Sequence, residues 1–333
     1  MHISRRSFRY ARRTQLFVGA GVAIVLLLLI YAVGGAAWAA RNSSILVQAV
    51  VTGLLLGGVY SLVSMGLTLI FGVLDIINFA HGAFMALAMY CAYVLVASVA
   101  LNPYLTLLIT IPVLFLLGFV LQRLLINRVM GQPTENQLLL TFGLSILVEN
   151  ILLLIFTGTP KAINNPFGQN TFSGVVHIFG AVADIPRIIA FLGSLLLAGI
   201  LYFILRSTTL GIAIRAVSQN PGGAAMVGIN VRSIYALTFG LGTACVGAAG
   251  ALVLPFLSVE PTTGEQFTII AFVVVALGGM GDIVGAFVGG LVIGLIQELA
   301  GALLPNANKL LIVFALFIVI LLFRPQGLFG RKT

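Results

Sequence analysis

Residues 53–82 read GLLLGGVYSLVSMGLTLIFGVLDIINFAHG, a long apolar run with a polar interruption near its end. Its first part belongs to an apolar segment, about 45–71. That segment is long enough to cross a membrane as a helix, because a spanning helix needs about 20 residues. Five residues then interrupt the apolar run: Gly72, Asp75, Asn78, His81 and Gly82. A charge at the centre of a membrane helix costs about 2.5–3.5 kcal/mol. We therefore expect one helix to end here, a break to follow, and a second helix to begin.

The composition of the whole chain agrees with a membrane fold. Of its 333 residues, 60% are hydrophobic and only 8% are charged, whereas about a quarter of the residues of a soluble domain are charged. The 38 glycines fit the same interpretation, because small residues allow membrane helices to approach closely. This composition excludes a soluble fold.

Apolar segments recur along the chain at the length of membrane-spanning helices. They predict an all-α, polytopic membrane protein with about ten transmembrane helices and with broken or re-entrant segments near 72–82 and 278–285. The ten segments are 16–38, 45–71, 80–100, 103–122, 137–157, 186–205, 233–254, 266–279, 283–304 and 308–323.

The basic residues give the expected orientation. Lys and Arg collect in cytoplasmic loops by the positive-inside rule, so the net charge of +9 indicates loops facing the cytoplasm and no nucleic-acid partner. Ten spans place both termini in the cytoplasm. Of the 17 basic residues, 13 then lie inside: Arg5, Arg6, Arg9, Arg12, Arg13, Arg123, Arg128, Arg206, Arg215, Arg232, Arg324, Arg331 and Lys332.

The first apolar segment has two interpretations. Arg12 and Arg13 precede it, and the small residues of 36–40 follow it, which is the pattern of a cleavable signal peptide. The segment 16–38 is also long enough to span a membrane, and its length favours a retained helix. Cleavage would leave the remaining topology unchanged.

The polar residues of the first break also have two interpretations. Asn78 and His81 are three residues apart, which places them on one face of a helix. They would then line a pathway for a small zwitterionic or polar solute. Alternatively, they satisfy the backbone groups that a broken helix frees and cap the next helix.

A second break, GGMGDIVG, occupies residues 278–285. Gly279 and Asp282 repeat the G-x-x-D-I spacing of Gly72 and Asp75. Transporters often contain two related halves with breaks at matching positions. Both breaks are expected near the inner face of the membrane, where a gate or an interface role is as reasonable as solute contact.

The longest inner loop, 206–232, contains two short helical stretches around a turn. Its first part is mildly amphipathic, Asn220-Pro221-Gly222-Gly223 forces the turn, and a second helical stretch covers 224–228. Such a loop is either a rigid knob for a cytoplasmic partner or a simple connector, and periodicity alone does not decide between them.

The chain lacks the motifs of an enzyme. It has no GxxxxGK[ST] phosphate loop, no HExxH and no GxSxG. Its two cysteines lie in apolar runs without metal-ligand spacing. We therefore expect neither a metal nor a cofactor, and no catalytic residues. Glu149 is the sole mid-helix candidate for an ion or proton site.

Four ordered motifs resemble one known family. The stretch Gly53–Gly82 is similar to the opening of the LivH-type permeases of ABC importers for branched-chain amino acids. The loop 211–229, GIAIRAVSQNPGGAAMVGI, resembles the cytoplasmic coupling loop of that family. Residues 271–282, AFVVVALGGMGD, and 323–329, FRPQGLF, are similar to its later motifs. The resemblance runs from about residue 45 to 330.

The resemblance implies a bacterial inner-membrane subunit that forms half of a translocation pathway. Its partners would be a LivM-like second permease, two cytoplasmic ATP-binding subunits that hydrolyse the ATP, an extracytoplasmic solute-binding protein and the lipid bilayer. The solute would be a branched-chain amino acid. Urea, short amides and other small organic acids are the alternative, and an ion-coupled secondary transporter is a remote one.

The two breaks themselves supply the candidates for the translocation pathway or its gate: Asp75, Asn78, His81, Gly82, Gly279 and Asp282. The resemblance assigns a role to the inner loop. The loop 206–232 would take up the motion of the ATPase through Arg215, Ala216, Asn220, Pro221 and Gly228. The chain is thus divided into a permease core, 45–330, and an additional part, 1–44, with a basic cytoplasmic tail and an extra membrane helix that typical LivH-type chains lack.

Overall fold

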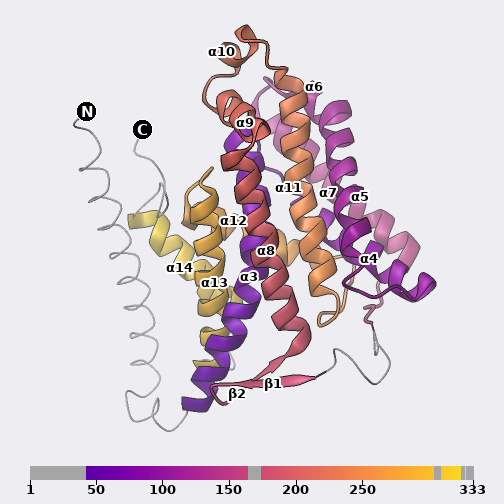
Figure 1. Ribbon diagram of the computed structural model, residues 1–333, viewed down its shortest axis with the longest axis vertical. Helices are drawn as coiled ribbons and strands as arrows, with labels where there is room; N and C mark the ends of the chain where they lie inside the picture. The colour runs from indigo at the N-terminus through magenta and orange to yellow at the C-terminus, as the bar shows by residue number, and fades with distance from the viewer. Residues whose placement is uncertain (1–42, 164–173, 304–308, 324–326, 328–333) are drawn as a thin grey trace.

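The computed structural model describes residues 43–163, 174–303, 309–323 and 327, and helices dominate it (Figure 1). Within these residues, seven helices are long and apolar enough to cross a membrane. They are α3 (Ser43–Leu74), α4 (His81–Val99), the continuous span Leu107–Val129, α7 (Thr134–Phe156), α8 (Ile185–Ser207), α11 (Val231–Val253) and α13 (Ile283–Leu303). The span Leu107–Val129 consists of α5 (Leu107–Leu121), the π-helical η1 (Gln122–Ile126) and α6 (Asn127–Val129).

Two shorter apolar helices complete the bundle: α12 (Thr263–Gly278) and α14 (Lys309–Phe323). Two further helices, α9 (Thr209–Gln219) and α10 (Pro221–Met226), form the loop between α8 and α11. The expected helical membrane fold is confirmed, and nine of the ten expected apolar segments are helices. The tenth, 16–38, lies outside the described residues, so the count of ten and the position of the termini stay predictions.

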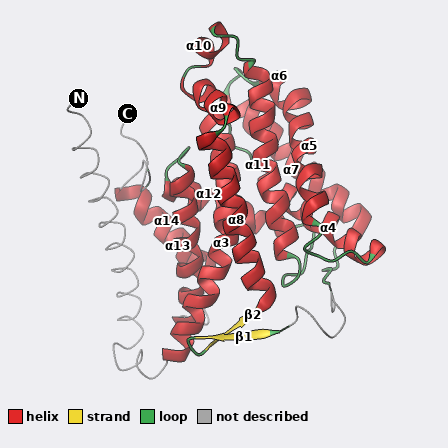
Figure 2. Cartoon of the chain, viewed as in Figure 1, coloured by secondary structure: helices red, strands yellow, loops and turns green. Residues whose placement is uncertain are grey.

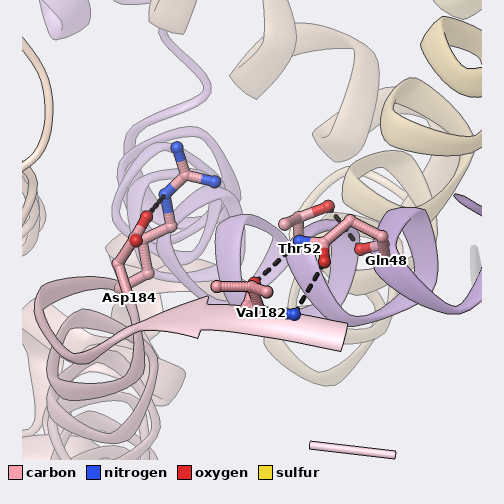
Figure 3. Close-up of polar contacts among 5 residues, drawn as sticks. Gln48, Thr52, Val182 and Asp184 are labelled. Carbon is pink, nitrogen blue, oxygen red and sulfur yellow. Dashed lines mark hydrogen bonds and ion pairs between the residues drawn. The ribbon is translucent and has the colours of Figure 1, made fainter. Parts of the chain in front are cut away.

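The loop before α8 contains a β-hairpin that the sequence analysis does not predict. Strand β1 (Val175–Ile178) pairs antiparallel with β2 (Ala181–Asp184), and Figure 2 shows the hairpin at the end of the bundle opposite α9 and α10. The Gln48 side chain fixes the hairpin to α3: its Nε2 donates to the Val182 carbonyl and its Oε1 accepts from the Val182 N–H, both at 2.7 Å (Figure 3). We call the two ends of the molecule the hairpin end and the α9–α10 end.

Glycines bring the central helices into backbone contact. A Cβ at Gly66 of α3 would lie 2.6 Å from the Gly242 carbonyl oxygen of α11, and a Cβ at Gly290 of α13 would lie 2.4 Å from the Ser61 nitrogen of α3. The Ser61 hydroxyl donates to the Phe287 carbonyl of α13 at 2.6 Å. Small residues and such hydrogen bonds are the usual sources of association between membrane helices. Helices α3 and α11 are consequently the most enclosed spans of the bundle.

Helices α4 and α12 begin halfway along the bundle. His81, the first residue of α4, donates from Nε2 to the Val63 carbonyl of α3 at 2.9 Å. Val63 is 11 residues before the end of α3 at Leu74, which is about 16 Å at 1.5 Å per residue. The start of α12 is at a similar depth, because Phe267 packs against Tyr60 of α3 with ring centroids 6.0 Å apart. From this level, α4 extends toward the hairpin end and α12 toward the α9–α10 end (Figure 1).

The break between α3 and α4 is therefore deeper than expected. Residues 75–80 are not helical, and they return from the α9–α10 end to the middle of the bundle. The expectation that this break stays near one face was wrong for its second half. Polarity along a sequence marks where a helix stops, but it does not show how far the following residues fold back.

Helices α3, α4 and α5 correspond one by one to α11, α12 and α13. Helix α3 packs on α13, and its counterpart α11 packs on α5, the counterpart of α13. The corresponding helices also contact each other, α3 with α11 and α4 with α12. The two sets run in opposite directions, as in transporters built from inverted repeats. The counterpart of residues 75–80 is thus the non-helical stretch 254–262 before α12. The break at 278–285 is therefore not the counterpart of the first break. The two segments that share the G-x-x-D-I spacing are in contact with each other and are not related by the repeat.

Candidate functional site

Two helix N-termini meet at the centre of the bundle. A Cβ at Gly82 of α4 would lie 1.9 Å from the carbonyl oxygen of Gly264 in α12. The Gly82 N–H donates to the Thr268 hydroxyl of α12 at 2.9 Å. The close approach requires glycine on both sides, because any side chain would overlap the opposite backbone. The first turns of α4 and α12 are thus joined about halfway along the bundle.

Asn78 and His81 support this joint from within the protein. Asn78 precedes α4, so the expectation that both residues share one helix face was wrong. The Asn78 Oδ1 accepts a hydrogen bond from the Ala80 N–H at 3.1 Å, and His81 Nε2 donates one to the Val63 carbonyl. Both side chains are fully buried. Their contacts favour the role of satisfying the broken backbone over contact with a solute in this conformation.

Four polar atoms around the break have no hydrogen-bond partner among the described residues. They are Ser64 Oγ, Thr68 Oγ1, Asn78 Nδ2 and His81 Nδ1, and all are buried. A buried polar atom without a partner costs about 1–3 kcal/mol. The polar groups around the break are therefore only partly satisfied by hydrogen bonds.

A polar surface at mid-depth is the feature that sequence reasoning missed. Glu265 is in the first turn of α12 and is exposed, although that turn is level with the middle of α3. It interacts electrostatically with Glu149 of α7. On the same side, Phe79 contacts the rings of Phe142 in α7 and Phe272 in α12, with centroids 6.3 Å and 5.2 Å away. We call these five residues the mid-depth surface.

The mid-depth surface is not suited to lipid. Phe79 and Phe142 are 37% and 54% exposed, which lipid would tolerate, but an exposed carboxylate in the hydrocarbon region would not be stable there. Such residues face water or another protein. The sequence placed Glu265 in a loop, and the available signal was the Pro261-Thr262-Thr263-Gly264 turn that starts a helix inside an apolar region.

A cavity of about 1040 Å³ opens at the α9–α10 end and collects several predicted site residues. Asp75 from the first break, Asp282 from the second and Arg215 from α9 all line it. The two breaks touch beside it, since a Cβ at Gly72 would lie 2.8 Å from the Cα of Gly281. Gly279 ends α12 with a φ of 99° and does not line the cavity. Asn78, His81 and Gly82 lie deeper, so the six pathway candidates form two groups.

The loop that contains α9 and α10 is a folded structure. Thr208 and Asn220 cap the two helices by accepting from the N–H groups of Gly211 and Gly223 at 3.2 Å and 2.9 Å. The Arg215 guanidinium donates to the Leu205 carbonyl at the end of α8. The expected pair of helical pieces is present, with the second at Pro221–Met226 where the sequence suggested 224–228.

The tip of this loop is apolar and exposed. Met226, the last residue of α10, and Val227, which follows it, are 91% and 77% exposed, and Gly228 then turns the chain with a φ of 87°. Ala216 lies on α9 between its buried face and its exposed face. A shaped loop with exposed apolar side chains at its tip is typical of a surface that another protein covers.

These features define a class of protein: a polytopic helical membrane protein with two helices that begin halfway along the bundle and a structured loop at one end. The chain belongs to the family of branched-chain amino acid transport system permease components, whose family model matches residues 49–321.

Individual relatives agree with this family. The branched-chain amino acid permease BraD of Pseudomonas aeruginosa is 31% identical over 85% of this chain and 95% of its own length. The permease LivH of Escherichia coli K12 is 30% identical over the same shares. The ribose import permease RbsC of E. coli K12 is 26% identical over 54% of this chain and 57% of its own. No solved structure matches the chain.

Proposed function

We propose that this chain forms half of the translocation pathway of an ATP-driven importer for branched-chain amino acids. The observation that carries the proposal is the mid-depth surface, where the first turn of α12 and the residues before α4 present Glu265 and Phe79 on the outside of the bundle. A wet pathway between this surface and a second permease explains why a carboxylate is exposed there.

Charge supports the orientation of the proposed importer. Arg206, Arg215 and Arg232 lie at or next to the α9–α10 loop. Helix α6, which follows η1 directly, lies at the same end of the bundle (Figure 1), and these two segments contain Arg128 and Arg123. Basic residues mark the cytoplasmic side. We therefore place the α9–α10 end in the cytoplasm and the hairpin end outside, in a bacterial inner membrane.

This orientation assigns the partners. The α9–α10 loop faces the two ATP-binding subunits, and Arg215, Ala216, Asn220, Pro221 and Gly228 shape the surface that they contact. The solute-binding protein delivers its cargo at the hairpin end. Asp75, Gly279 and Asp282 belong to the cytoplasmic gate, and Asn78, His81 and Gly82 hold the broken helices that surround the pathway.

The relatives and the mid-depth surface support the substrate class together. BraD and LivH are named for branched-chain amino acid transport. Glu149 and Glu265 are suited to an ammonium group, and the rings of Phe79, Phe142 and Phe272 are suited to an aliphatic side chain. Urea and short amides carry no ammonium group, so this surface favours an amino acid over them.

Transport is expected to require separate ATPase subunits. The complex, reconstituted in vesicles with its ATPases and binding protein, will take up radiolabelled leucine with ATP, whereas the permeases alone will show uptake at background under any ion gradient. Uptake by the permeases alone, driven by a proton or sodium gradient, would instead identify a secondary transporter.

The mid-depth surface is expected to be in contact with water. With Cys91 and Cys245 replaced by serine, a membrane-impermeant thiol reagent will label Glu265→Cys at least about 10-fold faster than Leu196→Cys on α8, an exposed position that we assign to lipid. The reason is that a thiol reacts as the thiolate, which forms in water and not in hydrocarbon. Equal and slow labelling at both positions would place Glu265 outside the pathway.

A further inference from the structure

The cavity at the α9–α10 end is lined by groups of both charges. Asp75 and Asp282 come from the two helix breaks. Arg206 comes from the end of α8, and Arg215 comes from α9. Asp75, Arg206 and Arg215 are exposed, and Asp282 is half-buried. Complementary charges thus line one open space.

None of these four residues has an ion-pair partner among the described residues, where the ion pairs are Asp184–Arg187 and Glu298–Lys309. Three of them have other contacts. Arg206 donates to the Tyr202 hydroxyl, Arg215 to the Leu205 carbonyl, and Asp282 accepts from the Gly285 N–H at 2.7 Å. Within the described chain, the Asp75 carboxylate has no hydrogen bond or ion pair.

Asp75 is also unfavourably placed in this conformation. It follows the last residue of α3, and the C-terminal end of a helix repels a negative charge. Its φ of 55° is in the left-handed region, which aspartate adopts more readily than most residues that have a Cβ. The unpaired carboxylate would gain a favourable contact if a basic side chain that lines the same cavity came within reach.

We propose that Asp75 and Arg215 form a latch: an ion pair that is open in this structure and closes when α9 moves over the cavity. Arg215 is the partner because it lies on α9 and moves with the loop, whereas Arg206 belongs to α8 and is held on the Tyr202 ring. Closure links the coupling loop directly to the first helix break. The latch rests on the proposed function, because ATP hydrolysis by the partner subunits would supply the force that moves α9.

The latch is tested by cross-linking in the complete complex. With the two native cysteines replaced by serine, the pair Asp75→Cys and Arg215→Cys will form an oxidative cross-link at least about 10-fold more in one nucleotide state, ATP-trapped or nucleotide-free, than in the other. The control pair, Asp75→Cys and Arg232→Cys, keeps one end of the latch and will show no such difference.

Uptake measurements give the second test. Asp75→Asn and Arg215→Gln will each lower ATP-driven leucine uptake about 10-fold, and the double variant will be no slower than the slower single variant. Glu135→Gln in the first turn of α7, which removes a charge away from the cavity and from the α9–α10 loop, will remain within about 2-fold of the wild type. The amount of each variant in the membrane is measured by quantitative immunoblot.

The outcomes separate the latch from the proposed function. If wild-type complex takes up leucine with ATP, yet Asp75→Asn transports normally and the cysteine pair never cross-links, the latch does not exist. Multiplicative losses in the double variant would show that the two residues act independently, which also overturns it. If the wild-type complex itself shows no ATP-driven uptake, the proposed function fails first.

Discussion

Replacing Gly82 with alanine is expected to remove both the folded protein and its transport activity. The new Cβ would lie 1.9 Å from the Gly264 carbonyl oxygen and 2.1 Å from the Thr268 hydroxyl. The carbonyl belongs to the backbone of α12 and cannot rotate away. The first turns of α4 and α12 must therefore separate, which also breaks the hydrogen bond from Gly82 to Thr268. Overpacking costs typically about 1–3 kcal/mol and sometimes more, so we expect the folded amount to fall at least about 10-fold.

The measurement is the amount of monodisperse protein after detergent extraction, followed by leucine uptake per folded molecule. Gly199→Ala in α8 is the matched control, because no atom lies within 4 Å of the added Cβ. Alanine also favours a helix over glycine by about 0.8–1 kcal/mol, so this control will be extracted at wild-type amounts or better. Normal extraction and uptake for Gly82→Ala would show that α4 and α12 do not meet as described.

Composition and periodicity were sufficient to predict the helices and the first break. The apolar runs required a membrane, and Asp75 could not remain inside a spanning helix. What they could not provide was depth. Residues 75–80 fold back to the level of Val63, and that return depends on glycine contacts between α4 and α12 that are distant in sequence. Asn78 and His81 were consequently placed on a helix face instead of inside the turn that starts α4.

The candidate site was only partly predictable for the same reason. Asp75, Asp282 and Arg215 stood out in the sequence because charges are rare in it, and the structure places them around one cavity. Glu265 did not stand out, because a helix that starts inside the bundle resembles a loop at its first residues when the sequence alone is considered. The hairpin was missed as well: its turn at Phe179 and Gly180 has positive φ at both residues, 51° and 83°, a geometry that phenylalanine seldom adopts.

The second large effect concerns the α9–α10 loop. Asn220→Ala is expected to lower ATP-driven leucine uptake about 10-fold while ATP hydrolysis by the complex stays within about 2-fold of the wild type. Asn220 accepts from the Gly223 N–H at 2.9 Å and so fixes the turn between α9 and α10. Loss of such a cap costs about 0.5–2 kcal/mol, and α10, with only six residues, has little else to stabilise it. The exposed tip at Met226 and Val227 then loses its fixed position.

Asn230→Ala separates this effect from a general loss of a helix cap. Asn230 caps α11 in the same way, accepting from the Ser233 N–H at 3.1 Å, and lies at the same end of the molecule. Its helix is 23 residues long and is packed along α3 and α5, so loss of the cap will shorten the helix by a turn at most and leave the loop tip in place.

Uptake and hydrolysis are measured on the same vesicles, with the inserted amount of each variant determined by immunoblot. Equal losses of uptake for both variants would mean that Asn220 contributes only stability. Normal uptake with Asn220→Ala would show that the loop only connects α8 and α11. A selective loss of uptake with Asn220→Ala would show that the loop transmits the work of ATP hydrolysis to the helices that carry the pathway.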